Sequence, residues 1–465
     1  MKHSLLPIAL AFALAAAPAT ASDPPYSGLA QAERLRDAAL KDDQVAWEIV
    51  EDLTTEIGPR LAGTEAEARA RDWAVRRLKA LGFRNIHIEE TEMDTWVRGE
   101  ERAEIVSPFP QKLAVTALGR SGATPPGGVT APVVGFDSVA ELEAAPDAEV
   151  RGRIVFVSHA MKPAQDGSGY GYYGPVRRNA PAIAARKGAV GVVIRSLGTD
   201  YHRNPHTGLT TWGETTPIPA GALSLPDAEN LQRVLKRAKS VTMRLTLTPR
   251  FVGKTKTGNV IADVPGADPS AGMILVGGHL DSWDLGTGAI DDAAGVAITA
   301  GAAKRIMDAG RPRRTIRLIW FGAEEVGGPG SKAYFEAHKT DKVVFVGESD
   351  FGADRVWKFD LALAEANKPL ADAIGKALFP LGIPRGDGTV SAGADLGAWV
   401  TAGSPGIDLQ QDGTRYFDIH HTPDDTLDKV DPAQLRQNVA AWTAVLNLVA
   451  NAKEEIVRLP PRPAQ

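Results

Sequence analysis

Histidine and carboxylate side chains gather just after the predicted strands in the second half of the chain. Strands are predicted over 273–276, 315–321 and 343–346; a histidine and carboxylates follow the first of them, and carboxylates follow the other two. A late loop, YFDIHHTPDDTL, adds two adjacent histidines. Neutral imidazole nitrogens and hard carboxylate oxygens form a ligand set that suits zinc. The side chains in question are His279, Asp281, Asp291, Asp292, Glu324, Glu325, Asp350, His420 and His421.

These segments are expected to meet at one edge of a sheet. In open α/β sheets, ligands bind beyond the carboxyl ends of the strands, so separate strand ends can deliver their side chains to one place. One histidine and one terminal carboxylate per ion, plus one shared carboxylate, make a two-metal site with ions roughly 3.5–4 Å apart. The pattern therefore predicts a two-metal centre.

Each piece of this pattern also has an ordinary structural interpretation. Asp291 and Asp292 could cap the N-terminus of the next helix, a common use of aspartate. The Glu324–Glu325 pair could begin a solvated helix, and single histidines after strands often only fill a core or a loop. The joint occurrence of every ligand type at successive strand ends favours the metal site.

Other kinds of catalytic site lose support from the sequence. The chain has no cysteine, which excludes disulfides, a thiol nucleophile and thiolate-bound metals. It contains no H-E-x-x-H and no G-x-S-x-G motif. The glycines at 286 and 288 lack the third glycine of a dinucleotide fingerprint, so they are interpreted as a turn.

Strands and helices alternate from residue 259 onward. This alternation predicts an α/β fold with a mixed, largely parallel sheet that helices sandwich on both faces. Two earlier helices are predicted near the N-terminus, over 45–57 and 65–81. The later predicted helices cover 292–307, 331–338, 368–378 and 432–450, and a further short strand covers 407–409.

The middle of the chain has a different texture. Short β-like runs alternate with helical stretches from about residue 131 to 250, and the loop SGATPPGG at 121–128 is interpreted as a boundary. We expect a small inserted α/β domain at 121–252. The main domain then comprises 22–120 and 253–458, and 459–465 is expected to be a flexible tail.

The first 21 residues have the pattern of a signal peptide. Lys2 and His3 precede an apolar run over 5–17, and Ala19-Thr20-Ala21 provides a small-x-small cleavage site. Cleavage after Ala21 would export the protein to the periplasm or the medium, with no membrane attachment afterwards; the alternative is an uncleaved anchor. With 52 basic and 57 acidic residues, the charge gives no support for a nucleic-acid partner.

The motifs resemble those of the co-catalytic di-zinc exopeptidases. This family includes zinc aminopeptidases, glutamate carboxypeptidases, glutaminyl cyclases and the non-catalytic transferrin receptor. The resemblance extends over nearly the whole chain after the first 21 residues and implies the zinc exopeptidase fold, with a protease-associated domain as the insert. It rests on GGHLDSWDLGTGAIDDAAGVA, GAEEVGGPGSKAY, ESDFG, YFDIHHTPDDTL and the early GPRLAGT.

The resemblance implies a role for each ligand of two Zn²⁺ ions. Asp291 resembles the carboxylate that bridges the ions. His279 and Asp350 would complete the site of one ion, and Glu325 and His421 the site of the other. His421 is preferred because the ligand in this family precedes a T-x-x-D-T-like run. The neighbouring His420 remains an alternative.

Two further carboxylates resemble residues that act on the water or on a ligand. Asp281 resembles the group that orients the ligand imidazole of His279. Glu324 resembles the general base that takes a proton from the metal-bridging water and delivers it to the leaving amine. Tyr416 is a candidate for stabilising the oxyanion, without support from a motif.

The expected function is that of an exported zinc-dependent exopeptidase acting on short peptides. The plasma glutamate carboxypeptidase branch, which acts as a dipeptidase, matches best. A broad-specificity aminopeptidase is the alternative. A third hypothesis is a non-catalytic binding protein like the transferrin receptor, although this chain retains every expected metal ligand and the expected general base. A homodimer is implied by the resemblance only.

Overall fold

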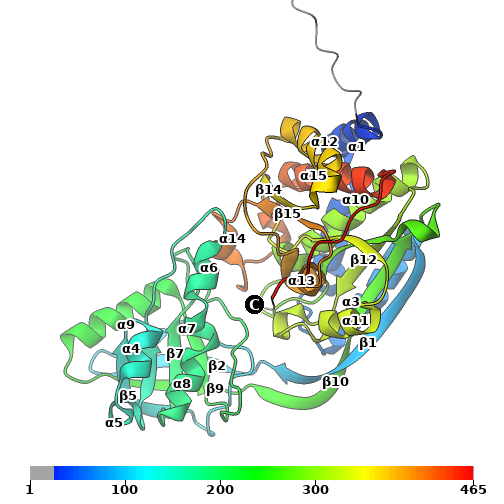
Figure 1. Cartoon of the computed structure of the whole chain (residues 1–465). Coiled ribbons are helices and arrows are strands. Elements are labelled where there is room, and N and C mark those ends of the chain that lie inside the picture. The colour runs from blue at the N-terminus through cyan, green and yellow to red at the C-terminus, as the bar shows by residue number, and fades with distance from the viewer. Residues whose placement is uncertain (1–25, 464–465) are drawn as a thin grey trace, which may run out of the picture.

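The computed structural model describes residues 26–463, so the expected signal peptide over 1–21 lies outside the described residues. These residues form two units, each built around its own sheet (Figure 1). Within the described part of the chain, no helix is both long and apolar enough to cross a membrane.

The first unit contains a mixed seven-stranded sheet. Its four central strands, β12, β11, β13 and β15, are parallel to one another, while β1, β10 and β14 pair antiparallel with their neighbours. The mixed, largely parallel sheet predicted from the alternation is thus confirmed. In spatial order the strands are β1 (Arg84–Val97), β10 (Arg250–Val264), β12 (Thr315–Phe321), β11 (Met273–His279), β13 (Val343–Glu348), β15 (Gly406–Gln411) and β14 (Val356–Ala362).

Helices cover both faces of this sheet because its strands are apolar on both sides. Along β12, Leu318 and Trp320 pack into one core and Ile319 and Phe321 into the other, as the alternation of side chains along a strand requires. The first core is closed by α1 (Leu29–Asp42), α2 (Val45–Asp52), α3 (Glu65–Ala80), α10 (Ala294–Ala309), α12 (Lys368–Leu378) and α15 (Pro432–Asn451). The second is closed by α11 (Pro329–His338) and α13 (Gly393–Thr401).

The second unit has an eight-stranded sheet with apolar side chains on both faces. One face packs into a core that also contains Trp96 and Trp283, and the other face is continuous with the first core of the first unit. In spatial order its strands are β3 (Gln111–Leu113), β2 (Glu101–Ser107), β9 (Thr242–Leu247), β5 (Val129–Phe136), β6 (Ile154–Val157), β7 (Gly191–Arg195), β8 (Ala220–Leu223) and β4 (Val115–Ala117). Its helices are α4 (Val139–Ala144), α5 (Asp147–Val150), α6 (Ser168–Tyr173), α7 (Pro175–Arg178), α8 (Ala180–Arg186) and α9 (Leu225–Arg237).

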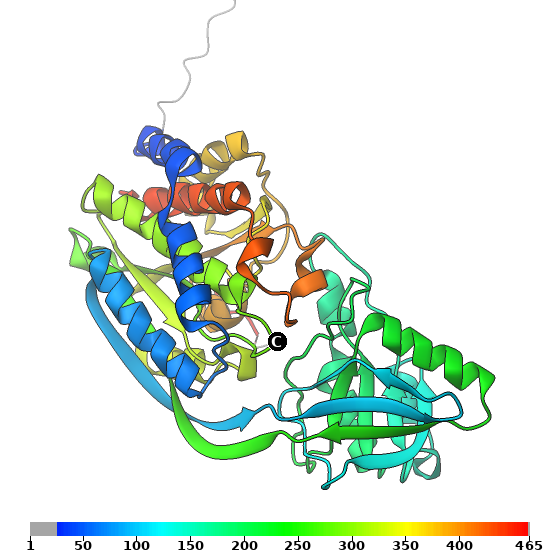
Figure 2. The ribbon, with the colours of Figure 1, turned by 180° about the vertical axis from the view of Figure 1, so that it is seen from behind.

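The two units are joined by a ribbon of two antiparallel strands. β1 runs from the first sheet toward the second unit, and β10 runs back from the second unit into the first sheet, as the long blue and green arrows in Figure 2 show. The expected boundary at residue 121 is therefore wrong, since residues 101–117 already belong to the second sheet. The Gly- and Pro-rich stretch at 121–128 is a turn inside that unit, where the amide of Thr124 donates to the carbonyl of Leu247.

The end of the chain also differs from the expectation of a flexible tail. Within the described part of that segment, the amide of Leu459 donates to the carbonyl of Gly403, and the amide of Arg462 donates to that of Thr401. The side chain of Arg462 donates to the carbonyl of Val390 at 2.7 Å. Residues 459–463 thus lie along the loops around α13, because their backbone donors find carbonyl partners there.

Candidate metal centre

The predicted ligands meet at the carboxyl ends of the central strands. β11 ends at His279, β12 is followed by the turn that carries Glu324 and Glu325, and β13 is followed by Asp350. The strands are parallel, so these ends share one edge of the sheet. The short helix α14 (Tyr416–Ile419) brings the two histidines that follow it to the same place.

Asp291 lies at the middle of the cluster, with one histidine on each side. Its Oδ1 is 3.0 Å from Nε2 of His279, and its Oδ2 is 3.1 Å from Nε2 of His421. The side chain of Asp291 is 5% exposed, so neither oxygen is satisfied mainly by bulk water. Two carboxylate oxygens that face different imidazoles form the geometry expected of a shared ligand.

A second carboxylate stands beside each histidine. Nε2 of His279 is 3.4 Å from Oδ1 of Asp350, and Nε2 of His421 is 3.0 Å from Oε2 of Glu325. The cluster thus offers two donor sets that share Asp291, each with one imidazole and one further carboxylate. Such a set of nitrogen and oxygen donors fits a metal of the zinc type.

His420 also approaches the shared aspartate. Its Nε2 is 3.3 Å from Oδ2 of Asp291, and its ring stacks on that of His421 with 3.5 Å between centroids. Only His421 of this pair also contacts Glu325. The two histidines therefore differ in the number of carboxylates they face, and distance to Asp291 alone does not separate them.

Asp292 has a different role from its neighbour Asp291. Its Oδ2 accepts the amide of His279 at 3.0 Å, and its Oδ1 accepts the amide of Gly295 at 3.0 Å, in the first turn of α10. Both interpretations of the sequence, helix cap and metal ligand, thus apply to this pair. Asp292 accepts an amide at the start of α10, and Asp291 faces the imidazoles. The peptide bond between them is cis, and α10 begins at Ala294 rather than at Asp292.

Asp281 holds both His279 and the turn that contains Glu324. The backbone carbonyl of Asp281 accepts a hydrogen bond from Nδ1 of His279 at 2.9 Å, while its carboxylate oxygen is 3.6 Å from that nitrogen. The same carboxylate accepts the amide of Glu324 at 3.1 Å. Asp281 is thus the residue that orients the imidazole of His279, as expected, but its backbone carbonyl makes the closer contact and its carboxylate the longer one.

Glu324 borders the cavity above the cluster without belonging to either donor set. Ala323, with φ of 65°, turns the chain sharply after β12 and leads into the short turn of Glu324. Burial raises the pKa of Glu324 well above its ordinary value, and the nearby carboxylate of Asp350 adds to the rise against the opposing effect of His279. A carboxyl group on the wall of the cavity, beside the donor sets, is placed as a general acid or base would be.

The histidines of the cluster differ in their proton affinity. Burial alone would lower the pKa of His279, but the carboxylates of Asp350, Asp281 and Asp291 outweigh it and raise the pKa well above 6.5. Glu325 and Asp291 have the same net effect on His421. For His420 burial prevails, with a contribution from His421, and its pKa is lowered well below 6.5.

Arg60 is a buried residue of this region to which the sequence assigned no role. Its guanidinium donates to the carbonyls of Leu280 at 2.5 Å, Thr287 at 2.6 Å and Gly288 at 2.9 Å. Burial lowers its pKa, and the carboxylate of Asp425 is the largest opposing effect. Arg60 thus fixes the loop that carries Asp281 and leads to Asp291; its signal in the sequence is the GPRLAGT stretch.

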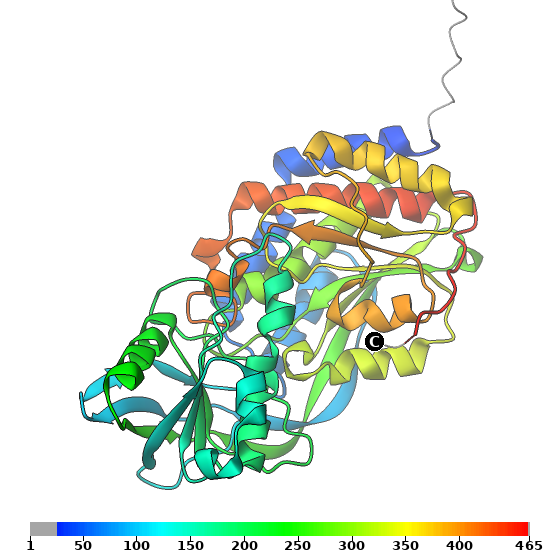
Figure 3. The same ribbon diagram turned by 60° about the vertical axis from the view of Figure 1, so that its left-hand side comes forward.

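The cavity over the cluster lies at the seam between the two units. Tyr170 of α6 stacks on Phe417 of α14, with 4.7 Å between ring centroids, and the cyan and orange helices meet there in Figures 1 and 3. The cavity has a volume of about 360 Å³. Its lining from the second unit is Tyr170, Arg177, Arg178 and Leu209; the first unit adds Asp291, Glu324, Glu325, Gly327, Asp350, Phe351, Ala394, Tyr416, Phe417, His420 and His421.

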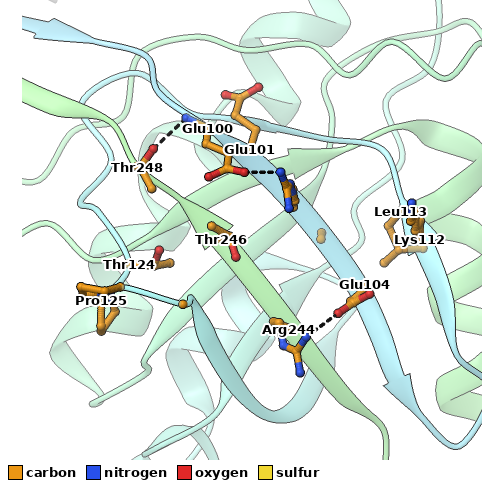
Figure 4. Close-up of a pocket in the computed structure, with 14 residues that line it drawn as sticks. Glu100, Glu101, Glu104, Lys112, Leu113, Thr124, Pro125, Arg244, Thr246 and Thr248 are labelled. Atoms are coloured by element: carbon orange, nitrogen blue, oxygen red, sulfur yellow. Dashed lines mark hydrogen bonds and ion pairs between the residues drawn. The ribbon is translucent and has the colours of Figure 1, made fainter.

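A larger groove of about 860 Å³ lies far from these strand ends, on the second sheet (Figure 4). Arg244 and Glu104 form an ion pair of 3.0 Å within it, and Thr248 accepts the amide of Glu100 at 2.7 Å. No histidine lines this groove. The predicted ligands therefore belong to the smaller cavity at the seam.

Comparison with known proteins identifies the family. Residues 259–446 match the model of Peptidase family M28. Carboxypeptidase Q of Mus musculus is 33% identical over 414 residues, which cover 87% of this chain and 86% of that protein. Carboxypeptidase Q of Homo sapiens is 33% identical, with coverage of 87% and 85%.

Solved structures agree with this result. The crystal structure of a Peptidase M28 precursor from Shewanella amazonensis SB2B has 43% identity and a TM-score of 0.91, and the match covers 94% of this chain and 99% of that one. An aminopeptidase from Aneurinibacillus sp. strain AM-1, at 19% identity and a TM-score of 0.59, shares the fold over 93% of this chain and 100% of that one.

The chain belongs to peptidase family M28. As a member of that family it is a hydrolase of the metallo-exopeptidase class. The resemblance to the zinc exopeptidases inferred from the motifs is thereby confirmed, with carboxypeptidase Q among the relatives, as is the expected fold.

Proposed function

We propose that the protein is a zinc-dependent dipeptidase that holds two zinc ions. Asp291 would be shared, with His279 and Asp350 on one ion and Glu325 and His421 on the other. The support is the arrangement of two donor sets around one buried aspartate. The chemistry that zinc supplies when bound in this way is polarisation of a carbonyl oxygen and a lower pKa for water.

Glu324 would act as the general base and acid. From the cavity wall it would accept a proton from the attacking water and then deliver that proton to the leaving amine. The variant Glu324→Gln should keep its zinc content, because Glu324 belongs to neither donor set, and should lose at least about a hundredfold in kcat. Retained turnover in this variant would remove Glu324 from the mechanism.

A single observation favours a dipeptidase over an aminopeptidase. Arg178 lines the cavity, and its guanidinium has no hydrogen bond or ion pair to any residue within 26–463. Its neighbour Arg177 already donates to the hydroxyl of Tyr170 at 2.5 Å and to the carbonyl of Thr207 at 3.3 Å. The free guanidinium of Arg178 would bind the C-terminal carboxylate of a two-residue peptide.

The test compares three forms of one peptide with zinc-loaded protein lacking residues 1–21. A dipeptide with both ends free should be cleaved, whereas its N-acetyl and C-amide forms should be poor substrates. Cleavage of the amide as fast as the free dipeptide would indicate an aminopeptidase. No cleavage of any form would favour a binding protein without catalytic activity.

Variants connect this specificity to the arginine. Arg178→Ala should raise KM for the free dipeptide by about tenfold or more, since a hydrogen bond to a charged group is lost, and should affect the C-amide far less. Arg186→Ala is the matched control, because Arg186 is exposed on the next helix. Equal effects of both variants would contradict the role of Arg178.

We further propose that the protein is exported after cleavage at Ala21. The support is the charged start, the apolar run and the small residues at the cleavage site. The mass of the mature protein from the periplasm or the medium tests this proposal, with an intact N-terminus as the contradicting result. Size measurement in solution tests the homodimer, which stays a prediction.

A further inference from the structure

A second cavity adjoins the one over the metal centre. It has a volume of about 180 Å³ and shares two lining residues, Asp350 and Phe351, with the first cavity. We call it the acidic chamber. Its lining residues are Asp166, Glu348, Asp350, Phe351, Ser391, Gly393, Asp408, Leu409, Gln410 and Gln411.

The polar lining of the acidic chamber is rich in acceptors. It includes four carboxylates and no lysine, arginine or histidine. Asp408 is already engaged, because its oxygens accept the amides of Ser391 at 2.8 Å and Ala392 at 2.7 Å. Lys358 of β14 is the register partner of Gln410 in β15, and its amine forms an ion pair of 3.2 Å with Asp360. The chamber thus gathers four carboxyl groups and has no basic side chain among its lining residues.

Two acceptors of the chamber have no partner. Oε2 of Glu348 accepts the amides of Asp395 at 2.9 Å and Leu396 at 3.0 Å. Oε1 of the same carboxylate has no hydrogen-bond partner within 26–463, although Glu348 is only 6% exposed. The side-chain oxygen of Gln410 is also without one. A buried acceptor left unpaired costs about 1–3 kcal/mol, so a donor placed beside either oxygen would be stabilised.

We propose that the acidic chamber binds the cationic side chain of the residue on the N-terminal side of the cleaved bond, a lysine or an arginine. This inference rests on the proposed dipeptidase function. Arg178 would hold the carboxylate of the peptide on the second-unit side of the metal centre. The chamber shares Asp350 and Phe351 with the cavity over the metal centre, so the side chain of the first residue would enter it past these two residues.

Binding of amino-acid amides to a variant expected to lack turnover tests the chamber without relying on hydrolysis. The zinc-loaded Glu324→Gln variant is titrated with L-lysinamide, L-norleucinamide and 6-aminohexanamide in a calorimeter. L-Lysinamide should bind about tenfold or more tightly than L-norleucinamide, which has the same α-amine but no side-chain charge. Equal affinities would overturn the proposal. Weaker binding of 6-aminohexanamide than of L-lysinamide is expected, because it lacks the α-amine.

Variants locate the charge preference. Gln410→Lys places a cation in the chamber and should bring the ratio of the two affinities close to one, because like charges repel. Glu348→Gln should also reduce the ratio. Because Glu348 accepts backbone amides at the start of α13, this variant could fail to fold, and the result for Gln410→Lys then decides. Glu365→Gln, at an exposed position, is the control and should leave the ratio unchanged. An unaltered ratio in Gln410→Lys would overturn the proposal.

Kinetics separate this inference from the function on which it rests. The ratio of kcat/KM for Lys-Ala over norleucyl-Ala should be about tenfold or more. If both dipeptides are cleaved equally well and the amides bind equally, the chamber proposal fails and the dipeptidase stands. If neither is cleaved but L-lysinamide is still preferred, the chamber stands and the dipeptidase fails.

Discussion

Replacing Arg60 by methionine should loosen the loop that carries the metal centre. The guanidinium is fully buried and donates to three carbonyls of the segment 280–288. Methionine fills similar space but donates no hydrogen bond, so these carbonyls would lose a charged partner. The carboxylates of Asp425 and Asp281, which interact with Arg60, would lose their nearby positive charge as well.

The expected size of the effect follows from these contacts. Hydrogen bonds to a charged group contribute about 1.5–3 kcal/mol each, which gives about 4–9 kcal/mol for three of them. The variant no longer has to desolvate a guanidinium, which offsets part of the loss. Removing one partner of a buried charge cluster typically costs about 3–5 kcal/mol. We therefore expect Arg60→Met to lower the free energy of opening this loop by about 4 kcal/mol.

Amide hydrogen exchange measures that free energy locally. A loss of about 4 kcal/mol corresponds to an increase of about a thousandfold in the exchange rate of amides protected by the loop. The amides to follow are those bonded in this segment, at Leu280, Ser282, Thr287 and Ile290.

The control is Arg76→Met, at an exposed position of α3. The midpoint of urea unfolding serves as the global measurement for both variants. The reasoning would be refuted if these amides exchanged hydrogen in Arg60→Met at the wild-type rate and the urea midpoint of this variant matched that of Arg76→Met. Arg60 would then not support the loop.

Two other predictions concern the metal and a buried acid. Removing zinc with a chelator should lower the thermal midpoint, and excess zinc should restore it, because an ion that binds only the folded state adds about 4 kcal/mol at a thousandfold excess over Kd; an unchanged midpoint would contradict the zinc proposal. Burial raises the pKa of Glu67 from 4.5 to about 7, so its folded state holds the proton more tightly. Stability relative to Glu67→Gln should therefore be highest below pH 4.5 and fall by about 3 kcal/mol as the pH rises to 8. Urea unfolding of both proteins at several pH values checks this, and a difference independent of pH would contradict it.

Local patterns sufficed to predict the central elements of the first unit. The predicted ranges of β12 and α12 agree with the structure at both ends, because an apolar run and a helical period are local signals. The side chains at the strand ends could be collected for the same reason: parallel strands bring their carboxyl ends together whatever the loops do. The structure brings these predicted side chains together, and their binding of zinc stays a prediction.

Features that depend on contacts distant in the sequence were not predictable. Arg60 acts on carbonyls more than two hundred residues away, and only the fold reveals them. Arg178 lies in the second unit, and nothing in its local sequence indicates that it lines a cavity with Glu324. The start of the second unit was also missed, because only the short segment 98–100 separates β1 from β2.

The ribbon of β1 and β10 makes the second unit a removable part of the chain. The chain leaves the ribbon at Val97 and returns to it at Arg250, and these two residues are register partners in the antiparallel pair. A short hairpin turn could therefore join them without changing the order of strands in the first sheet. The predicted ligands all belong to the first unit, whereas Arg178 belongs to the second unit. In this architecture, the part of the cavity that the second unit lines can evolve by exchange of one contiguous segment, while the predicted metal centre is inherited intact.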